Sequence, residues 1–266
     1  MKAHAGIDGI PHAGVKAEES FQFEYLFAPP HRAFAIAPGG AWSWQAGKET
    51  TDAAKKSALE ACGKYTQQKC VLYAVDNEIV FDAKSWSSLW GPYKTGQQAF
   101  KAATGVALGE KFPDIKFTDP AGVGKTLSQL RGKVVFIHFW GCWCASCRYE
   151  FVSLIDMYRI LRDVMGKDVE FVVLQMREPI TQAKAWAKEN NLSALPLSDS
   201  GVKSSSDTEL TLRSGKKIQD RDLAKIFPAS YVLDKHGIVI FSHMGSVSDW
   251  SEYVPFFRDA VSHSGK

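Results

Sequence analysis

The stretch that decides the fold is Val134-Val135-Phe136-Ile137-His138-Phe139-Trp140-Gly141-Cys142-Trp143-Cys144-Ala145-Ser146-Cys147-Arg148. Its first part, residues 134–139, is almost continuously apolar, which predicts a central strand covered on both faces. Its second part places a Cys-x-x-Cys pair where a helix is expected to begin, near Cys144. A cysteine pair at a strand-to-helix turn indicates dithiol–disulfide chemistry.

The residues that follow predict a helix and then a second strand. Apolar side chains recur at the i, i+3, i+4, i+7 spacing of one buried helix face: Phe151, Leu154, Ile155 and Tyr158. We expect the next strand over residues 170–174 and another helix over 181–189. Strand, helix and strand at this spacing imply a right-handed parallel βαβ unit. A hairpin over 231–241 and a last helix at about 248–261 complete the predicted mixed sheet with flanking helices.

The two cysteines of the pair have different expected tasks. Cys144 faces the unpaired backbone N–H groups of the helix start, which lowers a thiol pKa from about 8.5 to about 3.5–7.5. Cys147 lies one turn deeper and is shielded. The outer sulfur would attack a partner's disulfide, and the inner sulfur would then resolve the mixed disulfide. A structural zinc site would need a second pair of ligands close by, and the other cysteine pair lies in another domain.

The length of 266 residues favours two domains. Before the redox part, we expect strands over 33–37, 41–44, 70–75 and 79–81 and a helix over 53–61, which together make a small α/β module. The predicted organisation is a flexible lead-in over 1–30, this module over 31–90, a linker over 91–109 and the redox domain over 110–266. Several aromatic residues of the first part are expected in its core, with a partner-binding face as the alternative: Trp42, Trp44, Trp86, Trp90 and Tyr93.

All five cysteines fall into two groups, Cys62 with Cys70 and the three near residue 144. A bridge from Cys62 to Cys70 would close a short loop and stabilise the small module by roughly 2–3 kcal/mol. Such a bridge suits an oxidising compartment.

Charge and hydropathy exclude several classes of protein. The formal net charge of +3 is too weak a bias for a nucleic-acid or anionic-membrane partner. The sequence contains no apolar run of 18 or more residues, so no transmembrane segment is expected. Residues 1–20 lack the basic start and apolar stretch of a secretory signal, so we expect either a cytosolic protein or a mature chain whose signal has been removed.

Residues 127–135 and 139–148 resemble the TlpA/ResA-like branch of the thioredoxin superfamily, and the resemblance extends from about Gly109 to the C-terminus. It implies a thioredoxin fold and periplasmic or otherwise extracytoplasmic thiol–disulfide exchange with protein cysteines, often in the reductive direction. It implies no bound cofactor, because electrons arrive through the thiols of a partner, which we expect to be membrane-bound. Residues 58–75 are similar to a small domain of unknown function found in bacterial exported proteins.

The resemblance also assigns site residues. Trp143 precedes Cys144 in the motif. Pro228, in Ile226-Phe227-Pro228-Ala229-Ser230, matches the cis-proline loop that faces the cysteines and pairs with an incoming peptide. Glu150 matches an acidic residue that tunes the buried thiol and moves its proton, although a solvated helix glutamate is the alternative. Glu178 matches a second acidic position near the site.

Two residues depart from the family pattern. His138 stands where thioredoxins have a buried aspartate and where this branch often has asparagine. It is either a proton acceptor for Cys147 or a core histidine with satisfied hydrogen bonds. Cys142 is expected to be a surface thiol without a role. Alternatively it competes for Cys144, or helps to hold Cu(I) with Cys144, Cys147 and His138.

A long polar insertion over residues 198–225 precedes Pro228 and is a candidate lid or substrate-choosing loop, or simply a solvated one. The sequence thus predicts a thiol–disulfide oxidoreductase with Cys144 as nucleophile and Cys147 as resolving cysteine, acting in the reductive direction. Two alternatives stay open. One is a copper-binding or redox-sensing module, and the other is a partner-recognition role for the N-terminal domain with the redox domain as its switch.

Overall fold

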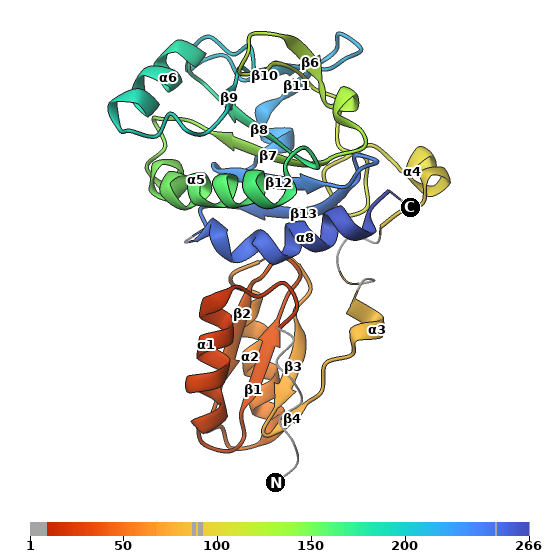
Figure 1. Cartoon of the computed structure of the whole chain (residues 1–266), viewed down its shortest axis with the longest axis vertical. Helices are drawn as coiled ribbons and strands as arrows, with labels where there is room; N and C mark the ends of the chain where they lie inside the picture. The colour runs from red at the N-terminus through yellow and green to blue at the C-terminus, as the bar shows by residue number, and fades with distance from the viewer. Residues whose placement is uncertain (1–9, 67, 87–88, 90–92, 248, 266) are drawn as a thin grey trace. The chain divides into compact units, whose positions relative to one another are not determined.

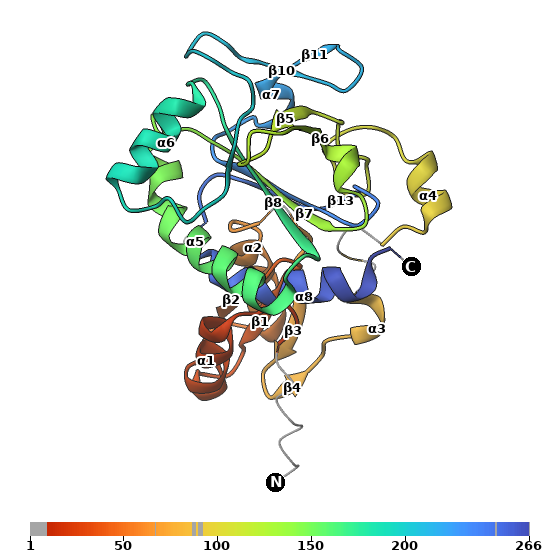
Figure 2. The same cartoon turned by 45° about the horizontal axis from the view of Figure 1, so that its top comes forward.

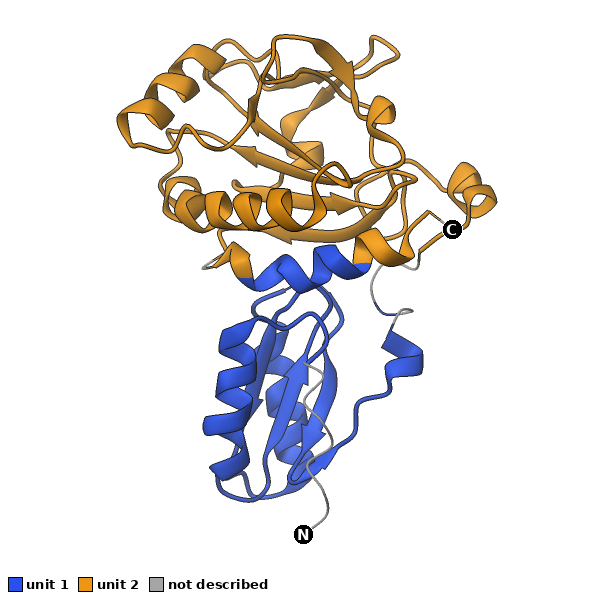
Figure 3. Ribbon diagram, viewed as in Figure 1, with its two compact units in different colours: residues 1–90, 252–259 blue, residues 91–251, 260–266 orange. Residues whose placement is uncertain are grey.

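The structure is a computed structural model that describes residues 10–66, 68–86, 89, 93–247 and 249–265 (Figure 1). The chain divides into two compact units, one of residues 1–90 with 252–259 and one of residues 91–251 with 260–266 (Figure 3). Parts of three expectations lie outside the described residues: the start of the lead-in (1–9), Trp90, and Ser248 at the start of the predicted last helix. Within the described ranges, no helix is long and apolar enough to cross a membrane.

The first unit is the small α/β module that the sequence predicts. Its elements are α1 Val15–Phe23, η1 Tyr25–Phe27, β1 Ala33–Ile36, β2 Trp42–Gln45, α2 Thr51–Cys62, β3 Val71–Val75, β4 Glu78–Ile79 and α3 Ala83–Trp86. The strands form an antiparallel sheet in the order β2-β1-β3-β4. Thr50 caps α2, since its side-chain oxygen accepts a hydrogen bond from the N–H of Ala53 at 3.1 Å.

The Cys62–Cys70 disulfide that the sequence predicts joins the end of α2 to the start of β3. Its surroundings are small and apolar. Cys62 is fully buried and packs in a cluster of alanines contributed by β1, α2 and the turn after β1. The half-buried Trp42 stacks on Phe34 with ring centroids 5.7 Å apart, so this tryptophan takes part in packing.

The described part of the expected lead-in is not loose, because it contains α1 and η1. Ala17 and Tyr25 are fully buried, and the ring of Phe21 stacks on Tyr25 and meets Phe34 edge-on. Only Ala17 and Ser20 of α1 are buried, which leaves no apolar stripe in the sequence. The packing of a few side chains, and not periodicity, therefore orders this segment.

The second unit holds the remaining elements. Its strands are β5 Lys116–Thr118, β6 Gly124–Thr126, β7 Val134–Trp140, β8 Val169–Gln175, β9 Leu197–Ser198, β10 Glu209–Thr211, β11 Lys217–Gln219, β12 Ala229–Leu233 and β13 Val239–Met244. Its helices are α4 Gly96–Lys101, η2 Leu127–Leu130, α5 Ala145–Met165, α6 Ile180–Glu189 and α7 Asp220–Leu223. Two more helices include residues of both units: η3 Trp250–Tyr253 and α8 Val254–His263.

The main sheet of this unit has the strand order β13-β12-β7-β8-β9. Strands β7, β8 and β9 are parallel, while β12 runs antiparallel to both of its neighbours. All of β7 is buried, as expected of a central strand. Helix α5 runs along the main sheet (Figures 1 and 2). It packs on β7 and β8 through Phe151 against Trp140 and Tyr158 against Phe171. The predicted mixed sheet with a parallel βαβ unit is confirmed.

Three segments differ from the sequence-based expectation. The expected linker contains α4, whose N-terminus is closed by a capping box between Thr95 and Gln98. The last helix begins later than expected, with η3 at Trp250, and α8 ends at His263. The insertion over 198–225 folds into the β10–β11 hairpin followed by α7, so it is more than a solvated loop.

Candidate functional site

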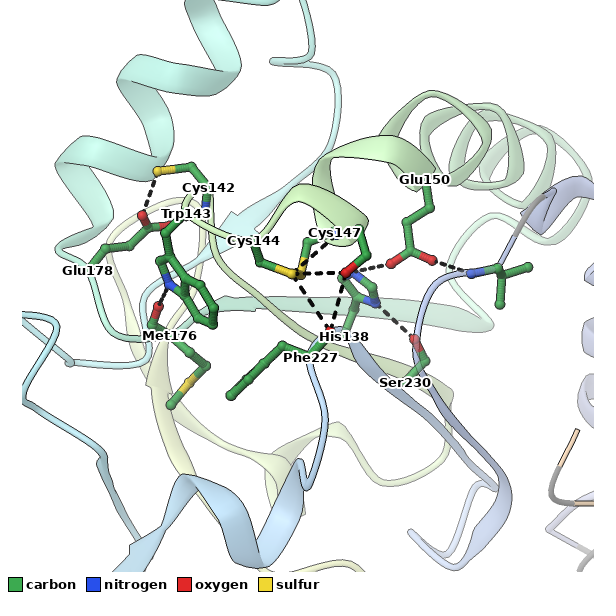
Figure 4. Close-up of a disulfide and its surroundings, with 12 residues drawn as sticks. His138, Cys142, Trp143, Cys144, Cys147, Glu150, Met176, Glu178, Phe227 and Ser230 are labelled. Carbon is green, nitrogen blue, oxygen red and sulfur yellow. Dashed lines mark hydrogen bonds and ion pairs between the residues drawn. A yellow bond between two sulfur atoms is a disulfide. The ribbon is translucent and has the colours of Figure 1, made fainter. Parts of the chain in front are cut away.

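The Cys144–Cys147 pair is a disulfide at the N-terminus of α5 (Figure 4). Strand β7 ends at Trp140, and Cys144 is the N-cap residue of α5, whose sulfur accepts a hydrogen bond from the N–H of Cys147 at 3.3 Å. Cys144 keeps 7% of its surface exposed and Cys147 none. The two sulfurs therefore differ in access, with the outer one at the helix end.

The loop that leads into β12 lies against the outer sulfur. The Phe227–Pro228 peptide bond is cis, as the resemblance implies. The Phe227 carbonyl lies 3.7 Å from the Cys144 sulfur and accepts a hydrogen bond from Ser146 Oγ at 3.5 Å. The sheet fixes this position, because β12 pairs with β7 and sets Ala229 opposite Phe139.

Trp143 forms one wall of the site. Its indole N–H donates to the Met176 carbonyl at 2.8 Å, and its ring meets Phe227 edge-on at 5.5 Å. The side chain is 46% exposed. Trp143 is therefore a half-exposed aromatic group next to the cysteine pair, held by its hydrogen bond to Met176, the residue that follows β8.

Glu150 is buried below the pair, so the solvated alternative is wrong. Its side chain is 1% exposed, and Oε2 accepts hydrogen bonds from the Val247 N–H at 2.9 Å and from Trp250 Nε1 at 2.8 Å. Burial raises the pKa of Glu150 to about 8, although these two hydrogen bonds oppose the shift. At neutral pH the carboxyl group is mostly protonated.

His138 contacts the other oxygen of that carboxyl group. Its Nε2 lies 3.3 Å from Glu150 Oε1, and its Nδ1 lies 2.9 Å from Ser230 Oγ. Complete burial lowers the pKa of His138 to about 3, so the ring is neutral. Because Oε2 already accepts two hydrogen bonds, the carboxyl proton belongs on Oε1, the oxygen that faces Nε2. The network thereby assigns the ring proton to Nδ1, which donates to Ser230.

Cys142 lies on the opposite side of the pair and is bound to Glu178 (Figure 4). The thiol donates to Glu178 Oε2 at 2.6 Å, and the backbone N–H of Cys142 donates to Oε1 at 2.7 Å. Burial, and then the Glu178 carboxylate, raise the pKa of the Cys142 thiol to about 11. The thiol is therefore neutral at physiological pH and is not the unbound surface group that the sequence suggests.

The copper hypothesis needs Cys142, Cys144, Cys147 and His138 to converge. Two of these sulfurs share a disulfide, and the nitrogens of His138 face Ser230 and Glu150. Among the described residues, no three His, Cys, Asp or Glu side chains are grouped so that they could hold a metal ion. The structure thus lends this alternative no support.

Several site residues were missed by sequence reasoning. Val247 and Trp250 hold Glu150 from about a hundred positions away, and no local pattern signals them. Ser230 could have been found, because it belongs to the same segment as Pro228 and faces His138 across the β7–β12 pair. The Phe227 carbonyl could have been found from its place before the cis-proline.

The strand order, the Cys-x-x-Cys pair at the start of α5 and the cis-proline beside it together define a thioredoxin-like protein with a disulfide at the usual redox position. The model of the Redoxin family matches residues 107–254. The chain belongs to the Redoxin family. The match leaves residues 1–106, and with them the small N-terminal module, unassigned.

Individual relatives agree with this assignment and confirm the resemblance to ResA-like proteins. The thiol-disulfide oxidoreductase ResA of Geobacillus kaustophilus is 34% identical over 93 residues, which are 35% of this chain and 52% of that protein. ResA of Bacillus cereus is 28% identical over 140 residues, 53% of this chain and 71% of that protein. The chain thus spans about half the length of the first of these relatives.

Among solved structures, one similar chain has a lower sequence identity. A secreted thiol-disulfide isomerase from Corynebacterium glutamicum is 21% identical with a TM-score of 0.42, over 55% of this chain and 84% of that one.

Proposed function

We propose that this protein is a thiol–disulfide oxidoreductase that reduces disulfides in other proteins. In the reduced enzyme, the Cys144 thiolate attacks one sulfur of the substrate disulfide and displaces the other as a thiol, which leaves a mixed disulfide on Cys144. Cys147 then attacks the Cys144 sulfur, forms the internal disulfide and releases the second substrate thiol. Two electrons pass from the cysteine pair to the substrate. No bound cofactor takes part in these steps.

The proton of Cys147 must leave before that cysteine can attack. We assign its acceptor to the ionised form of Glu150, one helical turn further along α5, because its pKa of about 8 is close to that of an ordinary thiol. His138 positions this carboxyl group. Since the Ser230 hydroxyl can donate or accept, the buried ring can be held in either neutral tautomer, facing Glu150 as acceptor or donor.

The substrate reaches Cys144 along the cis-proline loop. The Phe227 carbonyl beside the Cys144 sulfur marks the line along which a substrate backbone would pair, and Trp143 provides an apolar wall. We assign both Pro228 and Trp143 to positioning of the substrate segment. Neither residue takes part in the electron transfer.

Return to the dithiol state needs electrons from a donor with its own thiols, and we propose a membrane-bound donor outside the cytoplasm. One observation supports this location. The first unit holds a structural disulfide of its own, and such bonds persist in oxidising compartments.

The observation that supports the function most is the Cys144–Cys147 disulfide, with its outer sulfur at the start of α5 and its inner sulfur fully buried. The test is to trap the mixed disulfide. Cys147→Ser should retain a protein substrate on Cys144 that is released by dithiothreitol. Cys144→Ser, the matched control, should retain none. Equal trapping by both variants, or by neither, would contradict the assignment of nucleophile and resolving cysteine.

A further inference from the structure

Phe227, whose carbonyl faces the Cys144 sulfur, has two guanidinium groups over its ring. The Cζ atoms of Arg177 and Arg221 lie 5.7 and 5.1 Å from the ring centroid. Arg177 follows β8, and Arg221 belongs to α7 in the insertion. Cation–π attraction therefore holds two arginines from separate parts of the chain on the side chain of the residue whose carbonyl faces the redox disulfide.

The two arginines differ in their charged partners, because a carboxylate pairs with Arg177 and none pairs with Arg221 among the described residues. Arg177 is bound in a bidentate pair by Asp220, with Nε to Oδ2 at 2.7 Å and Nη2 to Oδ1 at 3.1 Å, and Asp220 is 1% exposed. Arg221 donates to the Lys225 carbonyl at 2.6 Å, and no carboxylate in the described part of the chain pairs with it. Arg177 therefore anchors α7, while Arg221 is exposed with an uncompensated charge.

The exposed charges nearest in sequence to the cysteine pair and to Arg221 are mostly of the same sign. Arg148 follows Cys147, and Lys225 lies two residues before Phe227. Asp222 is the exposed acid beside Arg221, whereas Glu178 is buried and occupied by Cys142. The surroundings of the outer sulfur thus favour an acidic partner.

We propose that Arg221 is a specificity-determining residue that binds an aspartate or glutamate of the substrate protein, close to the cysteine that is attacked. This inference rests on the proposed function. The guanidinium lies over the Phe227 ring and donates one N–H to the Lys225 carbonyl, and these two contacts restrict the direction of its remaining N–H groups. A planar guanidinium held in this way presents paired donors that match a carboxylate. The insertion is then a segment that selects substrates, through one side chain at the edge of the site.

The test uses three peptides that carry the same cysteine as a mixed disulfide with a chromogenic thiol. They differ in one flanking residue, which is aspartate, asparagine or lysine. Single-turnover reaction with the reduced protein gives a rate constant for each peptide. We expect the aspartate peptide to react about fivefold faster than the lysine peptide at low ionic strength, and the ratio to fall as salt is added.

Matched variants separate this charge effect from a structural one. Arg221→Gln should bring the ratio of aspartate to lysine rates close to one, and Arg221→Lys should restore part of it. Lys216→Gln removes the same charge from the turn of the β10–β11 hairpin and should leave the ratio unchanged. An unchanged ratio in Arg221→Gln, or equal rates for all peptides in the natural protein, would overturn the inference alone. Failure of the asparagine peptide to react at all would overturn the proposed function and this inference with it.

Discussion

The chain contains two disulfides whose surroundings differ in almost every respect. Cys62–Cys70 lies in a cluster of buried alanines, and in the described part of the chain no side-chain hydrogen bond reaches either sulfur. Around the Cys144–Cys147 pair lie a hydroxyl group, a backbone carbonyl, a helix N-terminus and a buried acid. The same bond is therefore structural in one unit and prepared for exchange in the other because of what surrounds it, since polar groups next to a sulfur control its thiolate form.

The largest expected effect is on the rate of disulfide exchange, which should depend on Cys144 and not on the Cys62–Cys70 bridge. Cys144→Ser should lower the rate of disulfide exchange by about a thousandfold or more, because the attacking sulfur is lost. The double variant Cys62→Ala/Cys70→Ala should keep the rate within about twofold of the natural protein, since its cysteines take no part in the exchange. Turnover of a model protein disulfide measures both. Loss of exchange in a folded double variant would show that the two bonds are not separate in function.

Loss of the Cys62–Cys70 bridge should lower the stability of the protein more than reduction of Cys144–Cys147 does. Removing the Cys62–Cys70 bridge should lower the free energy of unfolding of the first unit by about 2–3 kcal/mol, because the loop it closes is short. Urea denaturation of the full-length double variant, followed by circular dichroism, measures the change. The control is the natural protein with Cys144–Cys147 alone reduced. An equal loss in that control would contradict a structural role specific to the first bridge.

The sequence predicted local elements of the fold and missed the contacts between distant segments. The strand β7, the helix α5 and both cysteine pairs were predicted, since each depends on neighbours a few residues apart. The ties between Glu150 and Trp250 and between Arg177 and Asp220 join segments more than forty residues apart, which no local pattern encodes. Helix α1 was missed because its contacts come from very few side chains.

The buried acid below the second disulfide should make stability depend on pH. The pKa of Glu150 is raised from 4.5 to about 8 on folding, so its contribution is complete below pH 4.5 and is lost as pH rises through 8. The pKa of His138 is lowered from 6.5 to about 3, so its contribution is complete above pH 6.5 and is lost on acidification. Between pH 4.5 and 6.5 the two groups change the stability in opposite directions as pH rises. Of these two groups, only Glu150 changes the stability above pH 6.5.

Glu150→Gln therefore tests this part of the comparison. The natural protein should lose on the order of 1–2 kcal/mol of unfolding free energy as pH rises from 6.5 to 8, whereas the variant should lose much less. Urea denaturation across this range measures it. Glu189→Gln, at an exposed position on α6, is the control and should follow the natural protein. Parallel profiles for all three proteins would contradict a buried, protonated Glu150.

The smallest expected effect concerns the one cysteine outside both disulfides, Cys142. In the oxidised protein, Glu178→Gln should speed alkylation of Cys142 by iodoacetamide about tenfold at mildly alkaline pH, because each unit of pKa changes the thiolate fraction tenfold. Mass spectrometry over time measures the rate, again with Glu189→Gln as control. An unchanged rate would mean that Glu178 does not keep this thiol neutral.

The central claim is that the Cys144–Cys147 disulfide exchanges readily and in the reductive direction, and its reduction potential tests that claim most directly. Trp143 fluorescence can follow the transition in glutathione or dithiothreitol buffers, because the indole lies against the Phe227 ring beside the pair. Cys142→Ser removes any contribution of the third thiol. We predict a reversible two-electron transition at or below about −250 mV. A value near about −120 mV would identify an oxidant that donates disulfides, and the absence of any reversible transition would contradict exchange through this pair altogether.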